Sequence, residues 1–589
     1  MPTEPIHHHG GDRVATALKA HDVRTVFTLC GGHISPILTA SKARGIRIVD
    51  VRDEATAVFA ADATARLSGV PGVAAVTAGP GITNTITALK NAQLAQSPVI
   101  LFGGAAPTAL QGRGALQDID QRPLVSPHVK LFRKILQVRD LGPAVDEAFA
   151  VAQAGVPGPV FIECPVDLLY DEATIRQWYA DAAGKGTSIA DRLLRFYLNR
   201  HVGKMFAGSK VIPAPQVQQV TPPRAANSSI QATISALAKA ERPLLVIGSQ
   251  ALTIAAEAAS IAAAVARLGI PVYLSGMARG LLGRDHPLQM RHQRRQALRE
   301  ADCVLLAGVP CDFRLDYGRH VRRSATLIAA NRSAREARMN RRPDIAAIGD
   351  AGLFLETLAA EWVPQPELVK AAPRWTPWVD NLRTRDAIRE TEIDQQAKPT
   401  DAYVNPIAFF RALEREAGDN ALLVADGGDF VATASYVLHP RAPLTWLDPG
   451  VFGTLGVGAG FALGAAICRP DREVWIIFGD GACGYGLAEF DTFVRHGIPV
   501  IAVVGNDAGW TQIAREQVKM LHDDVATVLA RTAYHEVVAG FGAEGIIVKS
   551  MAEMPAALVR ARALAKAGKA VLVNVWLDKT EFREGSISM

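Results

Sequence analysis

The sequence has few of the features that mark secreted, metal-clustered or disulfide-stabilised proteins. Its 589 residues include only six cysteines, and no two of them form a CxxC pair, which disfavours both a disulfide framework and a zinc site. We expect these cysteines to be small buried residues of a protein in a reducing compartment. They are Cys30, Cys164, Cys303, Cys311, Cys468 and Cys483.

Neither sign of charge dominates. The chain has 63 Lys and Arg against 58 Asp and Glu, a formal net charge of +5, and its basic residues are scattered rather than gathered into a stripe. Binding to a phosphate backbone needs such a stripe, so no nucleic-acid partner is expected. The N-terminus also lacks a basic region followed by an apolar core, so a cytoplasmic protein without a secretory signal is predicted.

One uncharged run, Val451 to Cys468, reaches the lower length limit for a membrane span. Glycines recur through this run, and it sits between a strand-like segment and a loop. We therefore expect a buried glycine-rich helix and no membrane span.

Short apolar runs alternate with helical stretches in three blocks of the chain. In the first block these runs are VRTVFTL, IRIVDV, GVAAVT, SPVILFGG and PGPVFIECP. Strands that alternate with helices imply βαβ units and parallel sheets, so the predicted fold is α/β with three doubly wound parallel-sheet domains. The predicted boundaries are 1–185 for the first domain, 186–227 for a helical insert and linker, 228–370 for the central domain, 371–400 for a second linker and 401–589 for the third domain.

Two acids follow neighbouring predicted strands of the third domain. The strand in EVWIIFGDG ends at Asp480, and the next strand ends at Asp507. Open α/β sheets bind ligands at the carboxyl edge, where both acids are expected. Together with the carbonyl of Gly509 they supply half of an octahedral shell for Mg²⁺, which a diphosphate and water could complete. For the GDG sequence taken alone, a simple strand-ending turn is the alternative.

Asp507 follows Asp480 by 27 positions, and this spacing matches that of the thiamine-diphosphate (ThDP) motif in which GDG is followed by NN. The chain resembles ThDP enzymes of the acetolactate synthase and benzaldehyde lyase group over nearly its whole length. The segments GGHISPIL, VTAGPGITNT, SGMARGLLGR, CDFRLDYGR and LDPGVFGTLGVGAGFALGA are most similar to acetolactate synthase-like proteins, for which the family implies 2-hydroxyacyl-CoA lyase activity. The first domain would bind the pyrimidine ring of ThDP, and the third its diphosphate with Mg²⁺. Asp507 departs from the family, which has Asn at this position.

The resemblance also assigns cofactor contacts. Leu455 matches the bulky apolar residue that holds ThDP in its V shape, while Asp429 would be repelled by the diphosphate unless it faces away. The implied cofactor-binding residues are Gly427, Gly428, Phe430, Thr454, Leu455, Gly479, Gly481 and Ala482, and the implied metal residues are Asp480, Asp507 and Gly509.

Three residues are implied to be catalytic. Glu54 matches the family Glu that hydrogen-bonds the aminopyrimidine ring, and Val58 and Ala61 on the same helical face provide apolar surroundings. His33 and Gln117 match the residues that handle the proton of the substrate hydroxyl; a neutral imidazole can move that proton, whereas an amide can only orient it. For His33 alone, a loop histidine bonded to backbone is the alternative.

The implied reaction is cleavage of a 2-hydroxyacyl-CoA to formyl-CoA and an aldehyde or ketone, or the reverse condensation. Basic residues at Arg515, Lys519, Arg583 and 192–204 give weak support for an acyl-CoA, because surface charge explains them equally well. The first alternative is a decarboxylating transferase of the acetolactate synthase type, although GWTQIAREQ replaces the GMVxQWQ-like run of those enzymes. Benzaldehyde lyase-like cleavage of free acyloins and a regulatory subunit with an inactive site are further alternatives.

The central domain and the assembly are described less fully by the sequence. The central strands fit a nucleotide-binding fold, and whether the domain holds ADP, FAD or no ligand stays open; Asn331 stands where relatives carry an acid. The resemblance implies a homodimer or homotetramer with active sites at the dimer interface.

Overall fold

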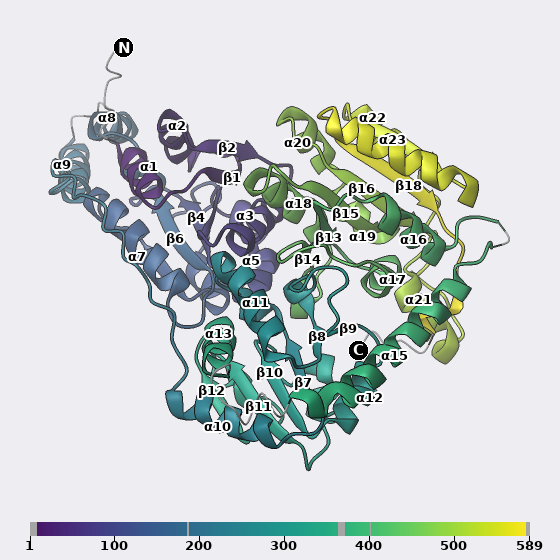
Figure 1. Ribbon diagram of the computed structural model, residues 1–589. Helices are drawn as coiled ribbons and strands as arrows, with labels where there is room; N and C mark the ends of the chain where they lie inside the picture. Colours follow the sequence, from purple (N-terminus) through teal and green to yellow (C-terminus); the bar gives the residue numbers. More distant parts are fainter. Residues whose placement is uncertain (1–8, 185, 187, 363–371, 401, 585–589) are drawn as a thin grey trace. The chain divides into compact units, whose positions relative to one another are not determined.

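The computed structural model describes residues 9–184, 186, 188–362, 372–400 and 402–584. The chain divides into two compact units, Met1–Ala65 with Val70–Thr221 and Arg66–Gly69 with Pro222–Met589. Within the described residues, the first unit has one six-stranded sheet and the second has two, and all paired strands in them are parallel (Figure 1). The predicted fold class, α/β with three parallel-sheet domains, is confirmed.

The sheet of the first unit has the order β2-β1-β3-β4-β6-β5. Its strands β3, β4 and β6 are buried at every residue, because helices cover both faces. The strands are β1 Thr25–Leu29, β2 Arg47–Asp50, β3 Gly72–Val76, β4 Val99–Ala105, β5 Leu131–Lys134 and β6 Val160–Pro165. The helices are α1 Gly10–Ala20, α2 Ser35–Ala43, α3 Glu54–Ser68, α4 Pro80–Thr83, α5 Ile86–Leu94, α6 Gln121–Val125, α7 Leu141–Gln153, α8 Glu172–Ala183 and α9 Ile189–Met205.

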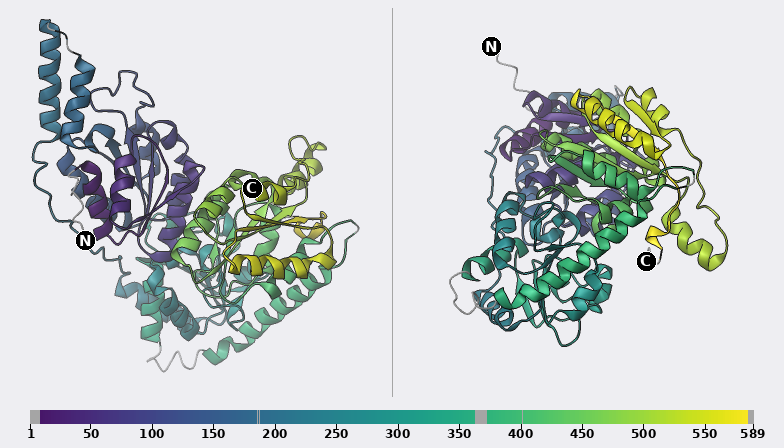
Figure 2. Two further views of the ribbon diagram at one scale, coloured as in Figure 1. Left: turned by 90° about the horizontal axis from the view of Figure 1, so that it is seen from above. Right: turned by 45° about the vertical axis from the view of Figure 1, so that its right-hand side comes forward.

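Helix α9 lies in the segment 186–227 that was expected to be a helical insert and linker, and it packs against α8, which precedes that segment. Within the first unit they project from the side of the sheet (Figure 2, left). The C-terminal end of α9 buries Val202 and Met205 in the core of this unit, whereas Leu193 and Phe196 remain exposed. The insert is therefore attached to the core through one end of α9.

The first sheet of the second unit has the order β12-β11-β10-β7-β8-β9. Its strands are β7 Pro243–Ile247, β8 Val272–Leu274, β9 Gln289–Met290, β10 Cys303–Ala307, β11 Thr326–Asn331 and β12 Ile345–Ile348. Its helices are α10 Asn227–Lys239, α11 Ala258–Leu268, α12 Arg294–Glu300, α13 Ala351–Trp362 and α15 Ala372–Gln396.

Helix α15 occupies most of the segment that was expected to be a linker, and it is the long helix in the right-hand view of Figure 2. The indole N–H groups of Trp375 and Trp378 donate to the carbonyls of Ala240 and Pro243, each at 2.9 Å. Both indoles are buried, so this segment packs as a structural element of the central sheet.

The last sheet has the order β14-β13-β15-β16-β18-β17. Its strands are β13 Ala421–Ala425, β14 Trp446–Leu447, β15 Glu473–Gly479, β16 Ile501–Asn506, β17 Glu544–Val548 and β18 Val571–Trp576. Its helices are α16 Pro406–Glu416, α17 Asp429–Val437, α18 Val457–Cys468, α19 Asp480–Gly486, α20 Glu489–Arg495, α21 Thr511–Leu521, α22 Tyr534–Gly540 and α23 Met554–Lys566. Helix α18 is buried from Val457 to Ala465, which confirms the glycine-rich helix expected there.

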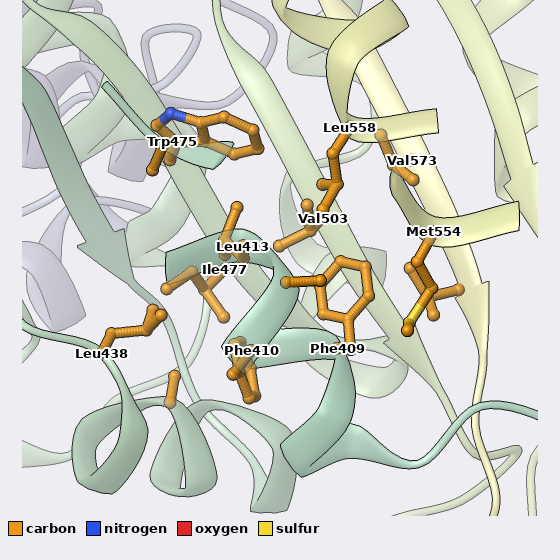
Figure 3. Packing of buried hydrophobic residues seen from close by; sticks show 14 of the residues in the cluster. Phe409, Phe410, Leu413, Leu438, Trp475, Ile477, Val503, Met554, Leu558 and Val573 are labelled. Carbon is orange, nitrogen blue, oxygen red and sulfur yellow. The ribbon is translucent and has the colours of Figure 1, made fainter. Parts of the chain in front are cut away.

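The core on one face of this sheet is built largely from aromatic and aliphatic residues of α16 and α23 (Figure 3). Phe409 and Phe410 are fully buried and lie beside Val503 and Ile477 of the central strands. This packing fixes strands β15 and β16, whose carboxyl ends carry the two predicted metal-binding acids.

The structure also bears on the cysteines and on the possibility of a membrane-spanning helix. Cys30 is exposed and Cys468 is half-buried, so the expectation that all six cysteines are buried was wrong at these two positions. No helix within the described ranges has both the length and the apolar character needed to cross a membrane.

Candidate functional site

One group of candidate site residues lies at the carboxyl edge of the last sheet. A cavity of about 40 Å³ opens there between the residues that follow β13, β15 and β16. It brings together nine of the residues predicted to bind cofactor or metal: Gly427, Gly428, Phe430, Gly479, Asp480, Gly481, Ala482, Asp507 and Gly509. Leu455 lies against Gly427, since a Cβ added to that glycine would be 2.2 Å from Leu455 Cδ2. Thr454 is not among the lining residues; its hydroxyl donates to the Leu455 carbonyl.

Asp480 is buried, and Asp507, whose charge acts on it, is half-buried. Asp480 accepts hydrogen bonds from the backbone N–H groups of Gly481 at 2.8 Å and Gly509 at 3.1 Å. Burial, and then the charge of Asp507, raise the pKa of Asp480 to about 7. Burial likewise raises the pKa of Asp507, although the neighbouring Thr511 and Lys579 lower it.

This arrangement fits a divalent cation. Two carboxylates that repel each other, one buried and one half-buried, are destabilised as anions, and a cation between them offsets both the repulsion and the lost hydration. Within the described part of the chain, no group of three or more His, Cys, Asp or Glu could hold a metal ion alone. The remaining oxygen atoms that coordinate a metal at this edge would therefore come from the backbone, from a bound small molecule or from water.

Asn506 and Asp507 point in different directions at the end of β16. The Asn506 side chain donates to the Thr532 carbonyl at 3.1 Å and to Asn574 Oδ1 at 3.2 Å, inside the fold. Asp507 instead lines the cavity. Of this strand-end pair, only Asp507 faces the cavity, and metal binding by it stays a prediction.

Glycines allow backbone and aromatic rings to approach closely in this cavity. A Cβ on Gly481 would lie 2.4 Å from the ring of Trp510, and one on Gly505 would lie 2.3 Å from the ring of Phe430. Either substitution requires the ring to move. The cavity therefore depends on residues without side chains.

Two groups that support this edge were missed by the sequence analysis. Asp426 is buried and accepts the N–H groups of Gly456 at 3.0 Å and Gly458 at 2.7 Å, and burial raises its pKa to about 7. It fixes the loop that carries Leu455. Tyr534 donates its hydroxyl to the Asp480 carbonyl at 3.0 Å. In the sequence, Asp426 is simply the acid that ends ALLVAD, and Tyr534 lies far from the motif.

Asp429 faces basic residues. Its carboxylate accepts from Arg515 at 2.7 Å, and Arg583 lies 3.9 Å away. The expectation that these two arginines face an extended substrate is not supported, because they surround a carboxylate of their own unit. Lys519 was also expected to face an extended substrate. Its side chain is exposed on α21.

A second group of candidate site residues lies at the carboxyl edge of the sheet in the first unit. Glu54 begins α3, is 7% exposed, and accepts a hydrogen bond from the Asn84 amide at 3.0 Å. Val58 and Ala61 on the same helix are fully buried, as expected. A Cβ on Gly81 would lie 2.9 Å from Thr77 Cγ2 and 3.6 Å from Glu54 Oε1, so Thr77 and Glu54 are close neighbours.

Thr77 joins the other two predicted catalytic residues. Its hydroxyl lies 3.0 Å from Nδ1 of His33 and 3.5 Å from Oε1 of Gln117. Burial lowers the pKa of His33, which favours the neutral imidazole. Gln117 has a φ of +61°, a strained backbone conformation that places it against Gly79. The sequence analysis missed Thr77, which appears there only as part of VTAGPG.

Comparisons with known proteins match three domains of the chain to one enzyme family. Residues 8–124 match "Thiamine pyrophosphate enzyme, N-terminal TPP binding domain", residues 230–358 match the central domain of the same enzymes, and residues 426–575 match their C-terminal TPP binding domain. Thiamine pyrophosphate is another name for ThDP. Each of the two TPP-binding matches contains one of the two groups of candidate site residues.

Relatives match over nearly the full chain. The chain is 50% identical to 2-hydroxyacyl-CoA lyase 2 of Homo sapiens, over 99% of this chain and 92% of the human protein. It is 49% identical to 2-hydroxyacyl-CoA lyase 2 of Caenorhabditis elegans, over 99% and 91%. A probable acetolactate synthase of Mycobacterium bovis is 34% identical, over 97% and 96%. The chain belongs to the thiamine pyrophosphate enzyme family.

Proposed function

We propose that this protein is a ThDP-dependent lyase that cleaves a 2-hydroxyacyl-CoA to formyl-CoA and an aldehyde or ketone. In this reaction the bond between the thioester carbonyl carbon and the hydroxyl-bearing carbon breaks. The hydroxyl loses its proton to become the new carbonyl, and the thioester carbon gains a proton to become formyl-CoA. The atoms balance without an oxidant or reductant. The observation that carries the proposal is the His33–Thr77–Gln117 group at the sheet edge of the first unit.

The residues of the last sheet would hold the cofactor. Asp480, Asp507 and the carbonyl of Gly509 would bind Mg²⁺, and the glycines around the cavity would admit the diphosphate. Asp426 would position Leu455 through the backbone of its loop. When bound, ThDP supplies the electron sink that carbon–carbon bond cleavage requires.

The residues of the first unit would handle protons. Glu54 would hold the aminopyrimidine ring by a hydrogen bond, as the family resemblance implies. His33, kept neutral by burial, would accept the proton of the substrate hydroxyl through Nε2, because Nδ1 is held by Thr77. Gln117 would orient that hydroxyl through its amide.

We further propose that two copies of the chain complete each active site, in a homodimer or homotetramer. Apolar side chains stand exposed beside each half of the site, which is expected of an interface. They are Leu110, Leu116 and Ile119 near Gln117, and Met520, Leu521, Val525 and Val528 at the end of α21 and just after it. The cytoplasmic location remains a prediction from the sequence.

Complementation tests the shared site. Glu54→Ala and Asp480→Ala should each be inactive. In a mixed dimer, one site carries both changes and the other carries neither, so refolding the two variants together should restore about a quarter of wild-type activity. An inactive mixture, with both variants shown to exchange subunits, would place both residues in the same site of one chain.

The activity itself is tested by product analysis. The protein is incubated with ThDP and Mg²⁺ and with either a 2-hydroxyacyl-CoA or pyruvate, and the products are identified by mass spectrometry. Formyl-CoA from the first substrate is expected. Acetolactate from pyruvate, without formyl-CoA from the thioester, would favour the acetolactate synthase alternative.

A further inference from the structure

The loop 106–120 follows β4 and carries Gln117. Gln117 has a φ of +61°, and Gly112 and Gly114 in the same loop have φ values of +70° and +80°. Apart from chain neighbours, no described residue would come within 4 Å of a Cβ added to either glycine, so the middle of the loop stands away from the rest of the unit. A strained residue such as Gln117 keeps its backbone conformation only where the surrounding structure holds it. The loop must therefore be held through its other residues.

Thr108, near the start of this loop, is bound to a buried carboxylate. Its backbone N–H donates to Oδ2 of Asp167 at 2.8 Å, and its hydroxyl donates to the same oxygen at 2.6 Å. Asp167 lies just after β6 and is 1% exposed. Burial raises the pKa of Asp167, and the hydrogen bonds from Thr108 and Tyr179 oppose that rise. Because a buried carboxylate without donors is costly, the fold gains stability by keeping Thr108 in place.

Helices α8 and α9 supply the other groups around Thr108. The hydroxyl of Tyr179, on α8, donates to Asp167 Oδ2 at 2.7 Å. Nε2 of His201, on α9, lies 2.6 Å from the hydroxyl oxygen of Thr108. A hydroxyl group has one proton, so while Thr108 donates that proton to Asp167, His201 donates to Thr108 through Nε2. We call these four residues, Thr108, Asp167, Tyr179 and His201, the Thr108 cluster.

A second contact holds the loop without α8 or α9. The ammonium group of Lys134, on β5, donates to Gln111 Oε1 at 2.7 Å and pairs with the buried Glu163 at 3.1 Å. One such anchor would let the chain pivot about it. The Thr108 cluster adds a second anchor close to the first, so together they fix the direction in which the chain leaves β4.

We propose that α8 and α9 position Gln117 through the Thr108 cluster. The proposal rests on the proposed function, in which the Gln117 amide orients the substrate hydroxyl. Helix α9 enters the core of this unit through Val202 and Met205, which follow His201 at the same end of the helix. The helices thus meet the rest of the unit where the loop of Gln117 begins. Since misplacing an orienting group by about 1 Å can cost about 100-fold in rate, even a modest loosening of the loop is measurable.

Hydrogen exchange followed by mass spectrometry tests the hold on the loop without reference to turnover. Loop amides have internal partners, such as the Gly112 N–H, which donates to Asp118 at 2.6 Å, so opening of the loop appears as faster exchange. In the enzyme loaded with ThDP and Mg²⁺, peptide 106–120 should exchange at least threefold faster in Thr108→Val and in His201→Ala than in the wild type. Thr108→Ser keeps the hydroxyl and His201→Gln keeps a donor near Nε2, so both should exchange like the wild type.

Phe196→Ala is the matched control, because Phe196 lies on α9 but is 67% exposed. It should leave loop exchange at the wild-type rate, and peptides of the last sheet provide the reference within each variant. Unchanged loop exchange in both Thr108→Val and His201→Ala overturns the proposal. An equal increase in Phe196→Ala overturns it as well.

Kinetics test whether the cluster acts through Gln117. Formyl-CoA release is measured per bound ThDP in Thr108→Val, in Gln117→Ala and in the variant with both changes. We expect Thr108→Val to lower kcat/KM at least fivefold when Gln117 is present and less than twofold in Gln117→Ala, where no amide is left to position. An equal loss in both backgrounds is a structural effect and overturns the proposal. A wild type that releases no formyl-CoA refutes the proposed function instead, and hydrogen exchange then decides whether the helices hold the loop.

Discussion

The hydroxyl of Thr77 lies 3.0 Å from Nδ1 of His33, and this contact fixes the imidazole ring at the sheet edge of the first unit. It commits one ring nitrogen to the protein, so the other is the one that can meet a substrate proton. The outer partners of a catalytic histidine commonly set its tautomer and orientation in this way.

Replacing Thr77 by Val removes the hydroxyl and keeps the shape of the side chain. Loss of one hydrogen bond costs about 1 kcal/mol, so kcat/KM should fall roughly fivefold to tenfold while ThDP affinity stays unchanged. Thr77→Ser should recover most of the loss. Steady-state kinetics with ThDP titrations measure both quantities, and an equal loss in the Ser and Val variants would contradict a role for the hydroxyl.

The pH profile should show the lowered pKa of His33. The neutral ring is the active base, and burial lowers its pKa below the ordinary value of 6.5, so activity should persist below pH 6.5 and fall only as the ring becomes protonated. The acidic limb of kcat/KM against pH reports this pKa in the free enzyme. An acidic limb centred above 6.5 would be inconsistent with a buried neutral His33.

Two glycines of α19 provide a matched pair of variants. A Cβ at Gly481 would lie 2.4 Å from the ring of Trp510, whereas a Cβ at Gly484 has no neighbour within 4 Å. Gly481→Ala should therefore weaken ThDP binding at least tenfold. Gly484→Ala should bind ThDP normally and stabilise the helix by about 0.5–1 kcal/mol. Similar ThDP affinities for both variants would show that the cavity does not receive the cofactor.

Removing one acid of the metal site should separate stability from metal binding. Asp507→Asn relieves the repulsion with Asp480, so the protein without metal should have a higher Tm than the wild type. The rise in Tm on adding Mg²⁺ and ThDP should be smaller than in the wild type, because one anionic ligand is lost. Thermal unfolding with a chelator and with Mg²⁺ measures both effects. A larger Mg²⁺-induced rise in the variant would argue against metal binding by Asp507.

Glu414 should contribute to stability in a defined pH window. Although its burial raises the pKa, hydrogen bonds from His439 and Arg441 outweigh this effect and hold the pKa of Glu414 at about 2. A depressed carboxyl pKa stabilises the fold fully above the unfolded value near 4.5, and this contribution is lost as the pH falls from 4.5 towards 2. Glu414→Gln should lower the free energy of unfolding at pH 7 by up to about 3 kcal/mol.

Denaturant unfolding at several pH values tests this expectation. The difference between wild type and Glu414→Gln should stay constant from pH 7 to pH 5 and shrink below pH 4.5. Asp419→Asn, a change at an exposed acid just after α16, serves as the control and should have little effect. A difference that grows as the pH falls would have the wrong sign for this ion pair.

The sequence predicted most of the fold, and the strands it missed share a property. Five strands of each sheet appear as apolar runs, and the missed ones are β5, β9 and β14. Each lies at the edge of its sheet and is two to four residues long. So short a strand gives no apolar run to detect. Helix α15 was missed as a packed element because its tryptophans are diluted by many polar residues.

The same limit applies to the candidate site. Asp480 and Asp507 lie at strand ends with a recognisable spacing, so their shared edge could be predicted from chain order alone. Thr77, Asp426 and Tyr534 act through contacts with residues up to 54 positions away, and no local pattern marks them.

The most direct test of the proposed activity follows the carbon atom on which the proposal depends. A 2-hydroxyacyl-CoA labelled with ¹³C at the thioester carbonyl is incubated with the enzyme, ThDP and Mg²⁺, and the products are followed by NMR and mass spectrometry. We predict that the label appears in formyl-CoA, with one equivalent of unlabelled aldehyde or ketone, and that His33→Ala reduces both products together. Label found in carbon dioxide, or retained in a carbon chain of unchanged length, would contradict cleavage at this bond.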